Sequence, residues 1–322
     1  MSDSLSPAER YARSKVKQET PAIDSFLSLL DFALDDFQEQ ACLALAAGKG
    51  VIIAQDQAEA DAAIDDMLAG NKFGDAGSRV VIEEFLKGEE ASFIVMVDGK
   101  NILAMATSQD HKARDNADHG PNTGGMGAYS PLPWAPDDIV EETYEKVLAP
   151  MIAEMAARGT PFVGLLYAGL ALTDHGLRVI EFNARFGDPE TQVLIPRLAT
   201  PLATLLYNAA TDNLDDTVLT WRDESAVTVV LAAQGYPESP KTKGAITNIP
   251  AISKTQIFHA GTSLNGVGLV SSGGRVLTVT GLGVDLTEAR DRAYRAISQI
   301  ELEGSFYRSD IAFNASVAEK GN

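Results

Sequence analysis

The alternation of hydrophobic and polar positions predicts a chain of mixed helices and strands. Apolar residues recur at helical spacing from Phe26 to Phe37, with acidic residues on the other side, as in an amphipathic helix that needs a partner surface. Short apolar or alternating runs indicate strands. We expect helices at residues 25–37, 58–68, 137–157, 191–198, 201–211 and 286–300, and strands at 79–86, 91–97, 101–107, 162–172, 227–233, 256–262 and 275–282.

These elements predict an α+β fold in three parts. We expect an N-terminal segment over residues 1–40, a domain of antiparallel sheets with helices over 41–225, and a small α+β module over 226–322 that ends in a polar tail after Phe313. Residues 108–136 have the pattern of one long loop. Loops of this length are usually functional or disordered, and the glycines of this one, with Met126 and Tyr129 among them, favour a functional loop.

A short strand at residues 179–183 carries the strongest candidate site. Because successive side chains point to opposite faces, Glu181 and Asn183 are expected to share a face with Val179, while Ile180 and Phe182 point into a core. A carboxylate and an amide oxygen two residues apart suit Mg²⁺, which prefers oxygen ligands.

The residues that follow this strand fit an anion-binding site, but they also fit an ordinary helix start with no binding role. Arg185 has a planar fork of donors that can clamp an anion. The alternative is a strand end followed by a helix, with Asp188 as its N-cap and Pro189 at its first position. From spacing alone, both interpretations stay open.

Two weaker groups of residues also suggest a nucleotide. Lys49 and Gly50 precede a strand, where a glycine-flanked lysine can lie over phosphates, or simply form a turn. Glu83 and Glu90 lie on either side of a strand end. Two acids there can face a ribose and an adenine amino group, or form a solvated strand edge.

Composition excludes several classes of function. The formal net charge of −19 argues against binding to nucleic acids or anionic membranes. No apolar run reaches 18 residues, so no membrane span is expected, and residues 1–20 contain no apolar signal core. Cys42 is the only cysteine, which excludes an intrachain disulfide. A cytoplasmic location is the resulting expectation.

Several stretches of the sequence together resemble a known family. They are LAAGKGVIIA, VVIEEFLKGEEASF, SQDHK, GPNTGGMGAYSPLP, GLLYAGL, VIEFNARFGDPETQ, FHAGT and GGRVLTVTGLG. The combination of GPNTGGMGAYSP with FNxRFGDPETQ is highly specific. On these residues the chain resembles the glycinamide ribonucleotide synthetases (phosphoribosylamine–glycine ligases), a family of ATP-grasp ligases.

The resemblance implies two cofactors, ATP and Mg²⁺ (or Mn²⁺). Glu181 and Asn183 match the family's metal ligands, which bridge the metal to ATP phosphates. A hinge that meets adenine, a ribose-binding acid and a mobile loop over the phosphates are also implied. The matching residues are, in that order, Glu83, Phe85 and Leu86; Glu90; and Lys49 with Gly50.

The implied reaction joins two small molecules, glycine and 5-phosphoribosylamine, into glycinamide ribonucleotide in de novo purine biosynthesis. Glycine is first activated as glycyl phosphate, and the amine then displaces phosphate. Arg185, Asn122 and Gly125 would face the reacting centre.

The chain departs from the family pattern at several positions. Where the family has a phosphate-binding lysine, this chain has Ala41, and the family's HKR ends in Ala113. The glycine-rich start of the family has no counterpart, and we expect residues 1–40 to match nothing in the family. We therefore expect an incomplete ATP-grasp domain, supplied with a separate N-terminal domain or self-associating through residues 25–37. The alternative is a catalytically inactive remnant that folds and at most binds nucleotide weakly.

Overall fold

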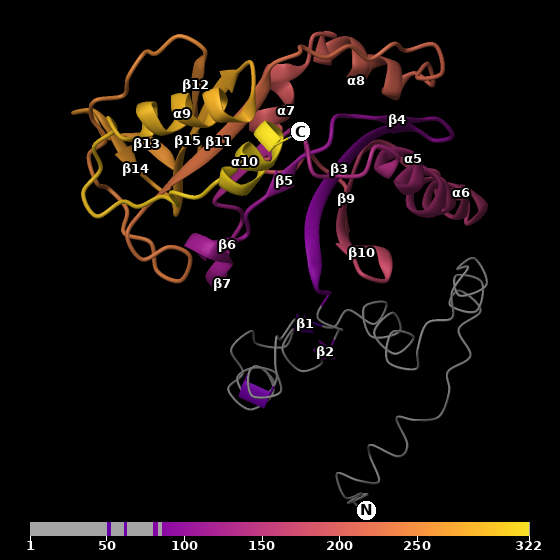
Figure 1. Cartoon of the computed structure of the whole chain (residues 1–322), viewed down its shortest axis with the longest axis horizontal. Coiled ribbons are helices and arrows are strands. Elements are labelled where there is room, and N and C mark those ends of the chain that lie inside the picture. Colours follow the sequence, from indigo (N-terminus) through magenta and orange to yellow (C-terminus); the bar gives the residue numbers. More distant parts are fainter. Residues whose placement is uncertain (1–49, 53–60, 63–79, 83–85, 322) are drawn as a thin grey trace, which may run out of the picture. The chain divides into compact units, whose positions relative to one another are not determined.

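The structure is a computed structural model that describes residues 50–52, 61–62, 80–82 and 86–321 (Figure 1). The chain divides into two compact units, one up to Leu86 and one from Lys87 on. In the first unit, β1 (Gly50–Ile52) pairs in parallel with β2 (Val80–Ile82), so the strands expected near these positions are confirmed. The helix expected at residues 25–37 lies outside the described residues.

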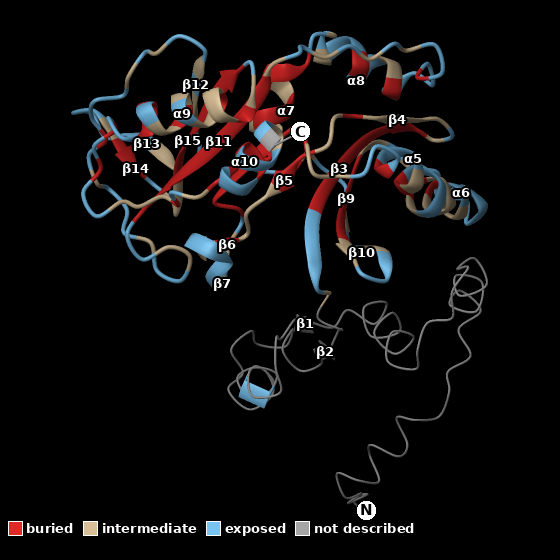
Figure 2. Cartoon of the chain, in the orientation of Figure 1, coloured by how far each residue is buried: buried red, intermediate tan, exposed pale blue. Residues whose placement is uncertain are grey.

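The second unit contains a four-stranded antiparallel sheet in the order β10-β9-β3-β4. Its strands are β3 (Gly88–Asp98), β4 (Ile102–Ala104), β9 (Val163–Thr173) and β10 (Gly176–Asn183). β3 and β4 form one hairpin, and β9 and β10 form another. The side chains of β3 are buried from Ala91 onward, whereas Gly88 to Glu90 are exposed (Figure 2). One end of the sheet is therefore accessible.

Helices cover one face of this sheet and part of the other. The helix expected at residues 137–157 is confirmed as α5 (Ile139–Thr143), a π-helical turn (Tyr144–Leu148) and α6 (Ala149–Ala157). Its Ile152 belongs to the same core cluster as Phe93 of β3. On the opposite face, Leu205 of α8 (Leu202–Ala210) packs with Ile94. Ser92 lies on that second face, two residues before Ile94 and towards the accessible end.

A second sheet has five antiparallel strands in the order β12-β15-β11-β8-β5. They are β5 (Gln109–Asp110), β8 (Gly127–Ser130), β11 (Ser225–Ala232), β12 (Thr255–His259) and β15 (Arg275–Gly283). The sheet thus combines strands from both sides of the expected boundary at residue 225. The division into 1–40, 41–225 and 226–322 stays a prediction.

The prediction of one long loop at residues 108–136 is wrong. This stretch contains β5, β6 (Ala113–Asp115), a 3₁₀ turn (Asn116–Asp118), β7 (His119–Asn122) and β8. All four residues of β8 are buried, because β8 pairs with β11 about a hundred residues later. Glycine-rich strands of two to four residues have no local signal of their own.

Helices pack on both faces of the five-stranded sheet. Gly281 lies under α9 (Leu286–Ile297), where a Cβ would overlap the helix backbone at Ala293. Thr280, on the opposite face, donates a hydrogen bond from Oγ1 to the carbonyl of Gln192 in α7 (Thr191–Arg197) at 3.0 Å. The Asp285 carboxylate caps α9 by accepting from the Glu288 amide at 2.7 Å.

The remaining elements lie at the edge of this sheet and at the end of the chain. β13 (Thr262–Leu264) pairs with β14 (Leu269–Ser271). The polar tail expected after Phe313 is instead a helix, α10 (Phe313–Gly321), which is anchored by a hydrogen bond from the Leu286 amide to the Glu319 carboxylate. Among the helices of the described residues, none combines the length and hydrophobicity that a membrane crossing requires.

Candidate functional site

A β-bulge at Ile180 decides which way the candidate metal ligands point. Val179 pairs with Leu170 of β9, but the next paired residue of β10 is Glu181, opposite Gly169. The extra residue reverses the alternation. Val179 therefore lies on the face opposite Glu181 and Asn183, so the expectation that all three share a face is wrong.

Glu181 and Asn183 nevertheless share one face of the four-stranded sheet. Glu181 pairs with Gly169, which pairs in turn with Ser92 of β3. Directly opposed residues project to the same side, so Glu181 and Ser92 face the same space with their backbones roughly 10 Å apart. A Cβ at Gly169 would lie 3.2 Å from Glu181 Cγ. The glycine therefore leaves the room that the Glu181 side chain occupies.

The donor set at this face fits a magnesium ion. Glu181 is exposed and Asn183 is half-buried, and both offer oxygen ligands from the same strand. Among the described residues, no group of three or more His, Cys, Asp or Glu side chains is arranged to hold a metal by itself. Two protein ligands suit Mg²⁺, because this ion usually completes its shell with waters and substrate phosphates.

A buried hydrogen-bonded cluster lies beside this pair of ligands. Ser92 Oγ donates to Glu190 Oε1 at 3.0 Å and also lies 3.0 Å from the Tyr167 hydroxyl. Glu190 is 3 % exposed. Burial, together with the Glu190 carboxylate, raises the pKa of Tyr167 well above its usual range, so its hydroxyl stays protonated. The cluster joins β3 and β9 to the segment after β10.

Asp110 is the least compensated group of the site. The residue is half-buried, but its Oδ1 atom is fully buried and accepts no hydrogen bond from the described residues. Burial, and then the nearby Glu190 charge, raise the pKa of Asp110 well above its usual range, while the cationic groups of Lys112 and Arg275 oppose the rise. A buried carboxylate without a partner is costly unless a cation or a proton neutralises it.

Lys112 is the cation that faces these acids. Its Nζ lies 3.0 Å from Glu90 Oε2 in a partly buried ion pair. Burial alone would lower the pKa of Lys112, but Glu90, and to a lesser extent Glu181 and Asp110, raise it. The lysine therefore stays charged at neutral pH.

Glycines allow the segments around Asp110 to approach closely. Gly125 has φ +104°, and a Cβ there would lie 2.5 Å from Asp110 Oδ1 and closer still to Pro189 Cδ. A Cβ at Gly187 would overlap the Glu190 carboxylate. The glycine-rich stretch and the FGDPE stretch, more than sixty residues apart, can meet only because neither glycine has a side chain.

Three more of the expected site residues lie in the second unit. Arg185 is exposed, and its Nη1 donates to the Phe186 carbonyl at 2.9 Å. Asn122, at the end of β7, is exposed too, whereas Gly125 is buried beside Asp110. In the first unit, Leu86 is half-buried and Gly50 is the first residue of β1. Lys49, Glu83 and Phe85 lie outside the described residues.

Asp188 has a different role from the expected helix cap. The helix begins at Thr191, after Glu190, and Asp188 instead forms an ion pair with Arg275, Oδ2 to Nη2, at 3.1 Å. Sequence reasoning also missed Asp110, Lys112 and Glu190 as site residues. Their signal was present, because all three belong to the SQDHK and FGDPETQ stretches.

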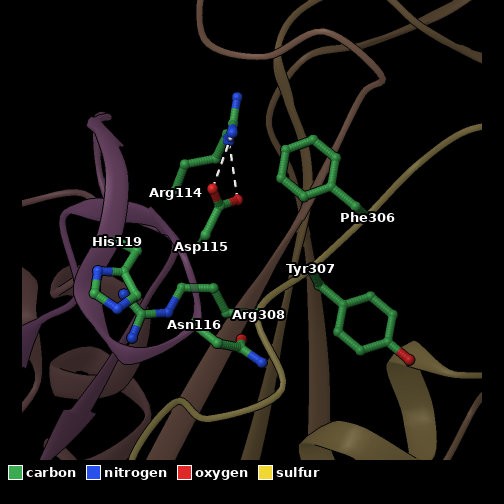
Figure 3. Close-up of a pocket in the computed structure, with 7 residues that line it drawn as sticks. All are labelled: Arg114, Asp115, Asn116, His119, Phe306, Tyr307 and Arg308. Carbon is green, nitrogen blue, oxygen red and sulfur yellow. Dashed lines mark hydrogen bonds and ion pairs between the residues drawn. The ribbon is translucent and has the colours of Figure 1, made fainter.

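A separate pocket of about 380 Å³ lies between the β6–β7 hairpin and residues 306–308 (Figure 3). Arg114, beside Asp115, forms one wall and Phe306 faces them. Behind it, the buried Arg308 guanidinium binds Asp118 and Asp310 at 2.7 and 2.8 Å. The arginines of this pocket are already paired, so it offers little free positive charge for an anion.

Comparison with known proteins shows which family the chain matches. A family model described as "Phosphoribosylglycinamide synthetase, ATP-grasp (A) domain" matches residues 14–191, and the C domain of the same synthetase matches residues 226–314. The first match includes much of the segment 1–40, for which we expected no counterpart.

Relatives with this name are similar over most of the chain. The phosphoribosylamine–glycine ligase of Streptomyces coelicolor is 53% identical over 85% of this chain and 65% of its own length, and that of Vibrio vulnificus is 50% identical over 86% and 65%. The chain therefore spans about two thirds of the length of these relatives.

Solved structures give the same result. The crystal structure of the Thermotoga maritima phosphoribosylamine–glycine ligase matches with a TM-score of 0.65 and 35% identity, covering 71% of this chain and 57% of that one. A Rhizobium etli pyruvate carboxylase, at 14% identity and a TM-score of 0.56, covers 88% of this chain and 27% of that one, and shares the fold alone.

Proposed function

The chain belongs to the phosphoribosylglycinamide synthetase family, and we propose from this that it ligates glycine to 5-phosphoribosylamine at the expense of ATP. The product is glycinamide ribonucleotide, an intermediate of de novo purine biosynthesis. One observation carries the proposal: Glu181 and Asn183 share a sheet face with Ser92, which binds the buried Glu190, and the charge of Glu190 acts in turn on Asp110. The proposal includes a cytoplasmic enzyme with small-molecule substrates.

Glu181 and Asn183 would hold Mg²⁺ (or Mn²⁺) against the ATP phosphates. When bound, the metal neutralises phosphate charge and orients the γ-phosphoryl group. Glu90 would contact the ribose. Lys49, Gly50, Glu83, Phe85 and Leu86 stay the proposed contacts to the rest of the nucleotide.

The first chemical step forms glycyl phosphate. A glycine carboxylate oxygen attacks the γ-phosphorus, the bond from phosphorus to the bridging oxygen breaks, and ADP leaves. Both reactants are anionic at this point. Arg185, which follows the metal ligands by two residues, would supply positive charge to the carboxylate, as would the Lys112 ammonium across the site.

Asp110 and Glu190 would bind the ammonium group of glycine. This assignment explains why one carboxylate oxygen, Oδ1 of Asp110, is buried without a hydrogen-bond partner near a second carboxylate. A glycine held as ammonium has no free electron pair on nitrogen, so it cannot attack its own or another acyl phosphate. The backbones of Gly125 and Gly187 approach these two carboxylates closely, because a Cβ at Gly125 would overlap Asp110 and one at Gly187 would overlap Glu190.

The second step forms the amide. The amine of 5-phosphoribosylamine attacks the carbonyl carbon of glycyl phosphate, the carbon–oxygen bond to phosphate breaks, and the proton that the amine loses leaves with the phosphate as hydrogen phosphate. Asn122 and Gly125 lie on the glycine-rich stretch that would face this centre. A separately supplied N-terminal domain, or self-association through residues 25–37, belongs to this proposal as a partner.

A catalytically inactive form that only binds nucleotide is the second candidate. Two departures from the family pattern favour it: Ala41 in place of a phosphate-binding lysine and Ala113 in place of an arginine. Loss of a buried charged contact typically costs about 2–5 kcal/mol of binding.

Measuring ADP release with ATP, Mg²⁺, glycine and 5-phosphoribosylamine distinguishes the two candidates. Release that requires both glycine and the amine supports the ligase. Mg²⁺-dependent nucleotide binding without such release supports the inactive form. Glu181→Gln is the matched control and should show neither.

A further inference from the structure

Arg275, the first residue of β15, joins two segments of the candidate site. Its Nη1 donates to the carbonyls of Gly124 and Asp188, the latter at 2.7 Å, and its Nη2 lies 3.1 Å from Asp188 Oδ2. The side chain is 22% exposed. A Cβ at Gly124 would lie 3.0 Å from the guanidinium carbon, so the guanidinium packs directly on the glycine backbone.

The residues that Arg275 binds are the immediate neighbours of those that enclose Asp110. Gly125 and Pro189 come together over the buried Oδ1 atom, and a Cβ at Gly125 would overlap both Pro189 and that oxygen. Arg275 binds the residue before each of them. Its positive charge also opposes the rise in the pKa of Asp110 that burial and Glu190 cause.

We infer that Arg275 is a positioning residue, which holds the Gly124 and Asp188 segments together and so keeps the Asp110 carboxylate in its enclosed orientation. We call the contacts of Arg275 with Gly124 and Asp188 the Arg275 clamp, and it is inferred from the hydrogen bonds described above. Its importance for glycine binding rests on the proposed function, in which Asp110 receives the glycine ammonium.

The contacts require an arginine for two separable reasons. The planar fork reaches two carbonyls and a carboxylate at once, which a lysine ammonium cannot match. The charge acts on Asp110 through space, and a lysine retains it. Arg275→Lys therefore removes the fork and keeps the charge, whereas Arg275→Gln removes both.

Two measurements on the full chain test the inference. We expect amide hydrogen exchange in residues 120–127 to quicken by at least about tenfold in both variants, because hydrogen bonds to a charged group are lost. We also expect glycine binding, followed by calorimetry against pH, to shift its midpoint to higher pH in Arg275→Gln alone. The other charges that act on Asp110, those of Glu190, Lys112 and Glu90, are unchanged in both variants.

Unchanged exchange in both variants overturns the inference, as does an equal pH midpoint in the Lys and Gln variants. A wild-type chain that does not bind glycine contradicts the proposed function but leaves the exchange test of the clamp intact. If Arg275→Gln does not fold, exchange in Arg275→Lys decides. Arg158→Gln, which removes an ion pair with Glu154 at the end of α6, is the matched control and should change neither measurement.

Discussion

Ser92 and Glu190 are joined by a buried hydrogen bond of 3.0 Å, although 98 residues separate them in the sequence. The bond connects the strand that begins the second unit to the segment that follows the candidate metal ligands. It places the buried carboxylate of Glu190, rather than an apolar side chain, against Ser92 on the sheet face that carries Glu181 and Asn183. The predictions below test the site that is built around this bond.

Glu181→Gln should abolish Mg²⁺-dependent nucleotide binding and leave the melting temperature unchanged. The side chain is exposed, so its charge adds little to folding, while a neutral amide is a much poorer ligand for Mg²⁺. Calorimetric titration with ATP in the presence and absence of Mg²⁺ measures the effect. Glu145→Gln, an exposed acid of the π-helical turn, is the control. Equal Mg-ATP affinity in the Glu181 variant would remove this residue from the site.

Asp110→Asn should stabilise the protein at neutral pH and weaken glycine binding. The folded-state pKa of Asp110 is raised above its unfolded value of 3.8, so its contribution to stability is fully present below pH 3.8 and is lost as the pH rises through the folded pKa. Asparagine does not titrate and avoids this loss, which we estimate at about 1–3 kcal/mol from the cost of burying an unpaired polar group.

Chemical denaturation of both proteins from acid to mildly alkaline pH measures this difference. The gain in the Asp110 variant should disappear towards acid, where the wild-type carboxyl is protonated. A constant difference at all pH values would show that Asp110 carries no uncompensated charge. Asp137→Asn, an exposed carboxylate before α5, should give no such dependence.

Gly125→Ala should destabilise the protein more than Gly159→Ala does. Both glycines have positive φ, +104° and +76°, so both substitutions cost about 1–2 kcal/mol of backbone strain. Only at Gly125 does the added methyl group meet other atoms, those of Asp110 and Pro189, whereas Gly159 has nothing within 4 Å. Equal free energies of unfolding for the two variants would contradict the close approach described at Gly125.

Arg308→Met should cost about 1.5–3 kcal/mol of stability, because the partly buried Asp310 and the Ala113 carbonyl lose hydrogen bonds from a charged donor. The Arg308 side chain is 1% exposed and also donates to the Ala113 carbonyl at 3.1 Å. Urea denaturation measures the loss. Arg114→Met, at a partly exposed pair with Asp115, should have little effect. A small effect at Arg308 would mean that its ion pairs merely offset their desolvation.

The local sequence pattern predicted a helix or strand well wherever buried and exposed positions alternate regularly within one segment. The helix expected at 137–157, the strands expected at 91–97 and 162–172, and the strand with Glu181 and Asn183 agree with the structure. These features depend on periodicities of two or 3.6 residues, which are visible over a few turns of chain. The pairing of Glu181 with Asn183 as metal ligands also follows from a local periodicity, because residues two apart on a regular strand share a face. Relatedness to the synthetase family is likewise a property of the sequence alone, carried by its motifs.

Tertiary structure decided the features that depend on contacts between distant segments. The bulge at Ile180 turned Val179 away from Glu181, and no local pattern distinguishes a bulged strand from a regular one. The short strand β8 is stable only because β11 pairs with it.

The same holds for the convergence of Asp110, Glu190 and Arg275, which lie up to 165 residues apart in the sequence. Periodicity reports whether a position is buried, but not which other buried position it meets. That pairing is fixed by packing and by the charge balance of the assembled site.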